Sequence, residues 1–448
     1  MTLRIAVFVH EFPALSETFV LNQVTGLLRL GCEVRVLATR RRNEPMEHAD
    51  VQRYGLVQRT VYLAMPAPRG RRLAAAFPIL VRQLRRHPRR LFRAVNPFRY
   101  GKLSSSLELL FWLDRLDGDG GRYDVILCHF GLIGRTAACL REIGSLHGML
   151  ATIFHGVDVS SVLRRSPHLY RHLFLHGDLF LAVSRRWRDR LIDHGCDPLR
   201  TLVHHTGVDP SRFAVSARRG SGDEALGVLT IGRHIEKKGI AYGLRAVALA
   251  RNRGVRLHYT IIGDGPQHET LRKLASVLDL SGIVNFVGWQ EQDMVIAYLR
   301  RSQVLLAPSI MDGRGEEEGI PVTLMEAMAT GMPVVSTRHS GIPELVEDDV
   351  SGLLADERDV VGLAEALIRL ERNPGLRKSL GRQARKAVTQ GFNIHFLNAQ
   401  LLDLLTELAR TGRRNGDRHE RIRRMIATRT ADFTCRRIKR REERPASG

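Results

Sequence analysis

Residues 316–344 read EEEGIPVTLMEAMATGMPVVSTRHSGIPE, and this stretch decides how the rest of the chain is interpreted. It predicts a helix at Val322–Ala329, where all but two positions are apolar. Pro321 suits the first position of that helix, because the N–H that proline lacks would be unpaired there anyway. A short buried strand is predicted next, at Pro333–Ser336.

Two carboxylates in this stretch predict a ligand site. Glu326 lies in the apolar helix, where a carboxylate is costly to bury unless hydrogen bonds are donated to it. It lies roughly 7 Å along the axis from Pro321, and its side chain leans toward the helix start, which Glu318 precedes in the loop. Carboxylates for hydroxyl groups, and first-turn amides for phosphate, together describe a nucleotide-sugar site. The alternative is a surface acidic loop followed by a packed helix with one salt bridge.

The same residues carry a resemblance. Glu318 and Glu326 match the E-x7-E pattern of retaining glycosyltransferases of family 4, which adopt the GT-B fold. The run EGIPVTLMEAMATGMPVVSTRHSGIPELV resembles the exopolysaccharide branch of that family, the colanic-acid and amylovoran type of enzyme. The resemblance covers about residues 3–408. It implies an α/β fold of two facing Rossmann-like, doubly wound domains with the active site in the cleft between them.

Length and composition agree with a two-domain globular enzyme. The chain has 448 residues, of which 44% are hydrophobic and 26% are charged. It contains no apolar run near the ~20 residues of a membrane span, and residues 5–9 are too short a run for a signal peptide. The five cysteines are scattered without paired spacing, which argues against disulfides or a zinc site. We therefore expect a cytoplasmic protein, with a peripheral position at the inner face of the membrane as a further expectation.

The net charge of +22 predicts a polyanionic partner. Between Arg69 and Lys102 there are eleven Arg or Lys and no Asp or Glu, interleaved with apolar groups and with prolines that prevent one long helix. This pattern predicts short amphipathic helices that dock on an anionic membrane, the alternative being a solvated face over a packed one. The tail 411–448, with thirteen basic and five acidic residues, is predicted to be disordered or only partly helical.

The first half opens as a parallel, doubly wound sheet. The order of strand Leu3–Val9, a helix starting near Glu17 and strand Glu33–Leu37 is a βαβ unit. In such sheets ligands bind at the loops beyond the carboxyl ends of the strands. Glu17 therefore lies on the ligand side. This acceptor-side domain is predicted to span residues 1–215.

Two histidines follow predicted strands of this sheet. His129 comes after one strand, and His155 comes after the next, within ATIFHGVD. That segment resembles the cleft segment of the family, and the resemblance implies that His155 contacts the transferred sugar. Acceptor binding falls to the first domain, with Glu17 and His129 as candidates. A purely structural role is the alternative for each histidine.

The second half repeats the pattern. Residues 216–224 read as a linker, residues 225–385 as the nucleotide-sugar donor domain, and 386–410 as helices that cross back to the first domain. Arg233 and Lys238 lie five residues apart at a strand-to-helix turn, where a guanidinium fork and a mobile ammonium suit a diphosphate. In the resembling family they bind the donor phosphates.

The resemblance implies a hexosyltransferase that moves a sugar, with retention, from a nucleotide-sugar to an exopolysaccharide or cell-surface glycan acceptor, and a lipid-linked form of that acceptor is expected. UDP is the expected nucleotide, and no metal ion or other cofactor is required. The residues expected to bind the donor are Arg233, Lys238, Gly319, Ile320 and Glu326, and those expected in catalysis are His155, Glu318, Arg233 and Lys238. Glu326 would hold the ribose hydroxyls, and Glu318 would face the donor sugar.

Three alternatives remain at this point. A nucleotide-sugar epimerase or a sugar phosphorylase would share the fold. A basic nucleic-acid-binding protein belongs to a different class and would explain the charge. Nucleic-acid binding is disfavoured because aromatic residues are only 6% of the chain and do not interleave with the basic runs.

Overall fold

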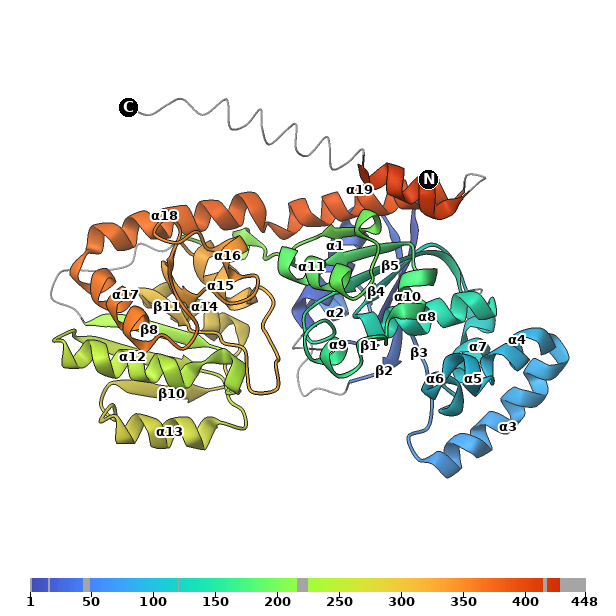
Figure 1. Ribbon diagram of the computed structural model, residues 1–448, viewed down its shortest axis with the longest axis horizontal. Coiled ribbons are helices and arrows are strands. Elements are labelled where there is room, and N and C mark those ends of the chain that lie inside the picture. The colour runs from blue at the N-terminus through green and yellow to red at the C-terminus, as the bar shows by residue number, and fades with distance from the viewer. Residues whose placement is uncertain are drawn as a thin grey trace.

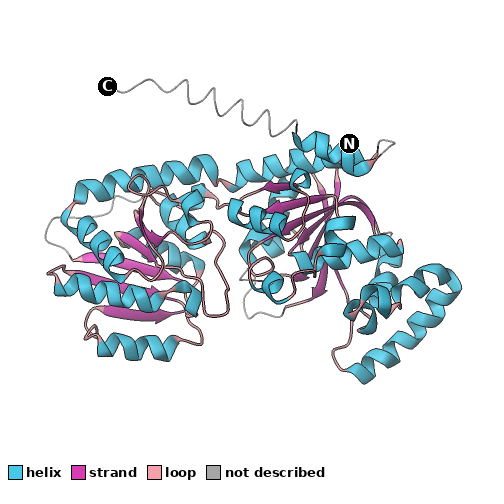
Figure 2. Cartoon of the chain, viewed as in Figure 1, coloured by secondary structure: helices cyan, strands magenta, loops and turns pink. Residues whose placement is uncertain are grey.

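The computed structural model describes residues 2–14, 17–42, 49–119, 121–215, 225–413 and 417–427. These residues form two lobes, each a parallel sheet with helices on both sides (Figures 1 and 2). The predicted linker 216–224 lies outside the described residues.

The first domain contains a seven-stranded parallel sheet in the order β3-β2-β1-β4-β5-β6-β7. Its strands are buried on both faces and read as nearly continuous apolar runs, as parallel strands covered by helices do. The strands are β1 Arg4–Glu11, β2 Glu33–Arg40, β3 Thr60–Tyr62, β4 Arg122–His129, β5 His147–Phe154, β6 Leu179–Ala182 and β7 Thr201–Val203. The helices that cover them are α1 Thr18–Arg29, α2 Ala49–Arg53, α7 Glu108–Asp119, α8 Gly131–Ile143, α9 Ser161–Arg165, α10 Arg171–His176 and α11 Arg185–Asp193.

The second domain repeats the plan with six parallel strands in the order β10-β9-β8-β11-β12-β13. The strands are β8 Leu226–Ile231, β9 Leu257–Ile262, β10 Val284–Gly288, β11 Val304–Ala307, β12 Val334–Thr337 and β13 Leu353–Ala355. The helices are α12 Ile240–Asn252, α13 His268–Val277, α14 Gln292–Arg301, α15 Val322–Ala329, α16 Ile342–Leu345 and α17 Val360–Arg372. The predicted helix Val322–Ala329 is confirmed, but Pro321 caps it from one position earlier than expected.

Two long helices connect the lobes along one side (Figure 1). α18, Pro374–Gly391, contacts α15 in the second domain, and α19, Ile394–Gly412, contacts α1 in the first. The Asn398 side chain donates a hydrogen bond to the backbone oxygen of Asn22, at 3.2 Å. The chain therefore returns to the first domain before it ends.

Part of the tail, predicted from the sequence to be disordered or only partly helical, is helical. Residues 418–427 form a helix, and Ile422, Met425 and Ile426 are buried in the first-domain core. Its basic residues do not all face solvent, because Arg423 pairs with Asp197 at 2.9 Å. An amphipathic face was enough to dock this segment. The rest of the tail lies outside the described residues.

A helical excursion leaves the first domain after β3. It consists of α3 Arg69–Arg86, α4 Pro88–Ala94, α5 Pro97–Tyr100 and α6 Lys102–Ser105. Pro88 and Pro97 begin helices as expected, whereas Pro78 lies inside α3 without ending it. Figure 1 shows this excursion at the end of the first domain that is remote from the second.

Candidate active site

Glu318 is held in the cleft by two lysines. Lys238 Nζ donates to Glu318 Oε2 at 3.0 Å, and Lys237 Nζ lies 3.5 Å from Oε1. Burial raises the pKa of Glu318 but the two ammonium groups lower it, and the net pKa is below its ordinary value. Glu318 is therefore a carboxylate. Lys237 is largely buried in this cluster.

Arg233 and Lys238 meet on one turn after β8. Arg233 is exposed, and the Lys238 stem folds back against Gly232, where a Cβ would approach its Cε to 3.3 Å. The turn therefore carries an exposed guanidinium five residues before the ammonium that pairs with Glu318. This arrangement suits a ligand that carries more negative charge than a single ion pair neutralises.

His339 orients the Glu318 loop, and sequence reasoning missed it. Its Nε2 accepts the backbone N–H of Glu318 at 3.0 Å, and its Nδ1 lies 2.6 Å from Glu357 Oε1. The ring is fully buried, so the neighbouring carboxylate selects which nitrogen carries the proton. Only the position of His339 within the 316–344 stretch could have drawn attention to it.

Glu317 faces the opposite domain instead of the ligand space. Its buried carboxylate accepts from Arg186 at 2.6 Å and from Arg190 at 2.9 Å, both on α11. Glu344 adds a second link, accepting the backbone N–H of Arg185 at 2.7 Å. Alternate residues of one acidic loop therefore bind the ligand-side lysines and the other domain.

The two domains touch where their site loops meet. A Cβ on Gly319 would lie 3.1 Å from the backbone oxygen of His155, tighter than most real contacts. Gly156 faces Gly319 with a φ of +147°, a conformation that side chains disfavour. The loop after β5 thus reaches the start of α15, and the glycines permit that approach. Ile320 follows with its side chain buried in the core, which leaves only its backbone for a ligand.

His155 and His129 form a neutral pair on the first-domain side. His129 Nδ1 and His155 Nε2 are 3.0 Å apart, and the ring of Phe19 lies 4.3 Å from that of His155. Burial lowers the pKa of His129 to about 3, and burial with the neighbouring His129 lowers the pKa of His155 well below its ordinary value. Both rings are uncharged at neutral pH. His155 is brought to the loop of Glu318, while His129 lies behind it.

Glu326 has surroundings of its own. Burial raises its pKa to about 7, while a hydrogen bond from Gln292 and the charge of Arg212 oppose that shift. It therefore does not join the Lys238 cluster. A carboxyl group that ionises near neutral pH can accept hydrogen bonds from a ligand as its proton leaves.

Glu17 is the remaining predicted site residue. Burial and the nearby Glu11 raise its pKa to about 7, and Arg42 lowers it. It immediately precedes α1, at the carboxyl edge of the first sheet. Phe19, two residues later, packs against the ring of His155. The loop residues 15–16 before it lie outside the described residues.

Among the residues that the structure describes, two clusters of histidine and carboxylate have spacings that could hold a metal ion. His234 and His268 approach to 3.1 Å between their Nδ1 atoms, beside Asp264. The other cluster is Glu142, His172 and His176. Its carboxylate already pairs with Arg99 and His172. The first cluster is hydrogen-bonded internally, so neither is a ready ligand set, and metal independence stays a prediction.

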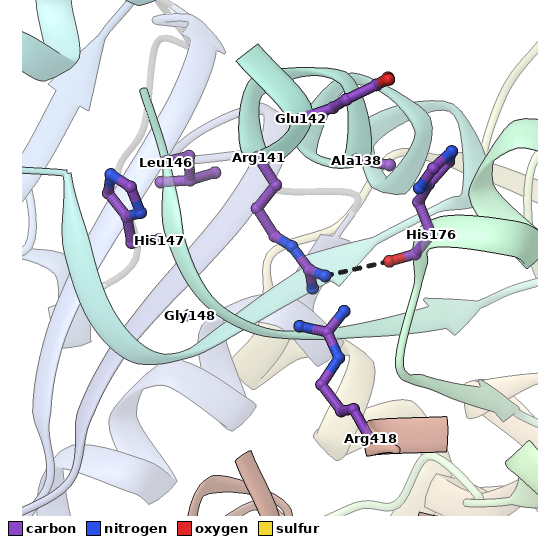
Figure 3. A pocket seen from close by; sticks show the side chains of 8 residues that line it. All are labelled: Ala138, Arg141, Glu142, Leu146, His147, Gly148, His176 and Arg418. Atoms are coloured by element: carbon purple, nitrogen blue, oxygen red, sulfur yellow. Dashed lines mark hydrogen bonds between the residues drawn. The ribbon is translucent and has the colours of Figure 1, made fainter. Parts of the chain in front are cut away.

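A separate cavity of about 310 Å³ lies at the amino end of β5, away from the Lys238–Glu318 ion pair (Figure 3). It is lined by Ala138, Arg141, Glu142, Leu146, His147, Gly148, His176 and Arg418. Arg141 and Arg418 both contact the buried Asp178, at 2.5 Å and 2.7 Å. The guanidinium groups therefore anchor the tail helix to the first domain, and the cavity is not part of the site described above.

Two facing Rossmann-like domains, with charged loops of one against a neutral ring pair of the other, define a two-domain α/β protein whose candidate site lies between the domains. Residues 16–212 match the family described as Glycosyltransferase Family 4, and residues 213–387 match Glycosyl transferases group 1. The chain belongs to these glycosyltransferases, and we can state the resemblance to family 4 as confirmed.

Its relatives span nearly the whole chain. It is 39% identical over 406 residues to the putative colanic acid biosynthesis glycosyltransferase WcaL of Salmonella typhimurium, covering 90% of this chain and 99% of that one. It is 36% identical over 411 residues to the amylovoran biosynthesis glycosyltransferase AmsK of Erwinia amylovora, covering 91% and 100%.

Solved structures show the same fold. Anabaena Alr3699/HepE, crystallised in complex with UDP, has a TM-score of 0.66 at 17% identity and covers 91% of this chain and 100% of its own. A glycosyltransferase from Rickettsia africae has a TM-score of 0.66 at 15% identity, covering 91% and 98%. The predicted GT-B architecture is confirmed. None of the helices in the described part of the chain combines the length and hydropathy of a membrane span.

Proposed function

We propose that this glycosyltransferase moves a hexosyl group, with retention at the anomeric carbon, from a UDP-sugar to a lipid-linked precursor of an exopolysaccharide. The observation that carries the proposal is the Lys238–Glu318 ion pair, in the loop where Gly319 meets His155. The names of WcaL and AmsK support an exopolysaccharide product, and the UDP complex of HepE supports the nucleotide.

The chemical difficulty is departure of the nucleoside diphosphate. Arg233 and Lys238 would bind its phosphates and stabilise the charge that develops on the leaving oxygen. Backbone N–H groups at Gly319 and Ile320 would add donors, although Pro321 removes one amide from this turn. As Lys238 turns to the diphosphate, Glu318 would be left facing the donor sugar. Its negative charge would stabilise positive charge at the reacting carbon and orient the hydroxyl groups.

The first domain supplies neutral groups and the acceptor side. His155, uncharged and packed on Phe19, would donate or accept one hydrogen bond with the transferred sugar without adding charge. Glu17 and His129 are the candidates for acceptor contacts. Closure of the domains through Glu317 would exclude water and so limit hydrolysis of the donor.

Calorimetric titration tests the donor. UDP, GDP, ADP and their common sugars are titrated into wild type and Glu326→Ala, because Glu326 is proposed to hold the ribose. Saturable binding of the UDP series, weakened by the substitution, is expected. Binding of no nucleotide by folded protein contradicts the proposal.

Product analysis tests the reaction itself. With a lipid-linked acceptor, NMR of the product gives the anomeric configuration, and inversion refutes the retaining assignment. Conversion of the donor sugar without any acceptor would instead show an epimerase. Consumption of inorganic phosphate would show a phosphorylase.

A further inference from the structure

An unpaired apolar stripe runs along the outer face of α3. Leu73, Phe77, Val81 and Leu84 fall within an arc of about 80°, given about 100° of rotation per residue. Their exposed fractions are 65%, 69%, 38% and 52%. We call these four residues the α3 stripe. Phe92 of α4 and Phe98 of α5 add further exposed rings, at 66% and 100%.

The α3 stripe is not the face by which the helix packs on its own domain. That face is formed by Ala76, Ile79 and Gln83, which are buried, and Gln83 hydrogen-bonds Asp117 of α7 at 2.7 Å. α3 therefore packs on its own domain with one face and exposes a second, apolar face that the described protein does not cover. Contiguous exposed apolar groups of this size mark an interaction surface.

The charge around the stripe selects the partner. Of the eleven basic residues from Arg69 to Lys102, three form ion pairs with carboxylates of the first domain, through Arg82, Arg90 and Arg99. Among the residues that the structure describes, no ion pair is recorded for six others: Arg69, Arg71, Arg85, Arg86, Arg89 and Lys102. The partner must therefore offer negative charge at its surface and an apolar interior just beneath. Nucleic acid provides the first without the second.

We propose that the α3 stripe, with Phe92 and Phe98, inserts into the headgroup region of an anionic lipid leaflet while the surrounding arginines bind lipid phosphates. Binding then involves more than electrostatic attraction, because the apolar side chains enter the boundary between headgroups and acyl chains. Long Arg side chains can reach past an apolar seam to phosphates at the same depth.

The topology places this surface usefully for catalysis. β3 and β5 run parallel in one sheet, so the excursion after β3 and the His155 loop after β5 leave from the same edge. Figure 1 shows that the excursion then runs to the side of the first domain that is remote from the second. A bilayer bound there would present a lipid-linked acceptor to the first domain, which is the proposed acceptor side. This consequence rests on the proposed function, whereas the binding itself does not.

Vesicle sedimentation of the full chain tests the proposal. Vesicles of phosphatidylcholine alone are compared with vesicles containing about one-third phosphatidylglycerol, at low and high salt. Wild type is expected to sediment with the anionic vesicles and to be released partly by salt. Phe77→Asp and Leu84→Asp should each weaken partitioning about tenfold or more, because each removes a large buried apolar side chain from the lipid.

A matched control separates insertion from general charge. Val277 is exposed at the end of α13 in the second domain. Its change to Asp alters the net charge by the same amount as Phe77→Asp or Leu84→Asp. Val277→Asp should sediment like wild type. Phe77→Ser, which adds no charge, should weaken binding in the same direction as Phe77→Asp, and circular dichroism confirms that each variant is folded.

Three results would overturn the proposal. One is absence of sedimentation with anionic vesicles, and another is sedimentation that Phe77→Asp and Val277→Asp reduce equally. The third is a wild-type dimer that Phe77→Asp dissociates, since a second copy would then cover the stripe. The assay contains no nucleotide, so vesicle binding by a protein that binds no UDP would refute the proposed function alone.

Discussion

The two faces of the cleft differ in charge although they come from the same kind of domain. The second domain presents ions, with Glu318 between Lys237 and Lys238 and with Arg233 exposed nearby. The first domain presents uncharged rings, with His155 against His129 and Phe19. Both sets of groups follow the carboxyl ends of parallel strands. The same architecture therefore carries a charged face in one domain and a neutral face in the other.

The two faces differ in whether nearby counter-ions offset the cost of burying a charge. Desolvation acts on both faces. Glu318 stays ionised because Lys237 and Lys238 offset its burial, whereas burial is not offset at His129 and His155, which stay neutral. A charged leaving group would be served by the ionic face. A sugar, which offers hydroxyl groups and an apolar ring face, would be served by the neutral one. The following substitutions test that division of labour.

The largest effect is expected for Lys238→Ala on the ionic face. Loss of a cation that stabilises the leaving diphosphate should lower kcat about 10²–10³-fold, while Tm falls only slightly because Lys237 still pairs with Glu318. Turnover and thermal denaturation are measured on the same preparation. Lys237→Ala is the matched control and should retain much more activity. Parallel loss of stability and turnover in Lys238→Ala would assign it a structural role instead.

His155→Ala tests the neutral face and should lower kcat about tenfold to a hundredfold, less than removal of an ion, because a neutral hydrogen bond contributes less. The pH–rate profile of the wild type should show no step from His155 near the ordinary histidine pKa of 6.5, since burial lowers that pKa. A step there that disappears in His155→Ala would show that the ring is charged in the working enzyme.

Glu326 should make nucleotide binding depend on pH. Its pKa is raised to about 7, so one pH unit below that value about a tenth is ionised and UDP affinity should fall about tenfold. Calorimetric titration at several pH values measures this dependence, which Glu326→Gln should abolish. Pronounced pH dependence that persists in the variant would exclude Glu326 as its source.

The same group affects stability with a definite sign. Because the folded pKa lies above the unfolded value of 4.5, the folded protein holds the proton more tightly. Its stabilising contribution is complete below the unfolded pKa and is lost as the pH rises through about 7. The Tm of the wild type should therefore fall with rising pH relative to the Tm of Glu326→Gln, as measured by thermal denaturation at several pH values.

The smallest effect is expected for the link between the faces. Glu317→Gln removes the ion pairs to Arg186 and Arg190. Because their partly exposed guanidinium groups can be hydrated instead, the free energy that favours domain closure should fall by only about 1 kcal/mol. The donor KM should rise about threefold to fivefold, with kcat less affected, as closure becomes less favourable. Asp189→Asn, an exposed carboxylate on the same helix α11, is the control. An unchanged KM would show that Glu317 does not govern closure.

Local pattern predicted much of the secondary structure. The helix Val322–Ala329 has the predicted bounds, because apolar runs between Gly and Pro signals report burial directly. The predicted strands Leu3–Val9, Glu33–Leu37 and Pro333–Ser336 overlap β1, β2 and β12 with ends shifted by no more than three residues. The tail was predicted to be disordered or only partly helical, and residues 418–427 form a helix. Its docking was not predicted, because Ile422, Met425 and Ile426 pack on a first-domain core that the local sequence does not reveal.

By itself, the sequence determined the two parallel α/β halves, the family, and the identity of the residues at the strand ends, since each depends on spacing along the chain. Only the tertiary structure decided their partners. It paired Lys238 with Glu318 across eighty residues, turned Glu317 toward Arg186, and brought Gly319 against His155. Ion pairs, burial and the resulting pKa shifts depend on distances in space, and local spacing contains no record of which loops will meet.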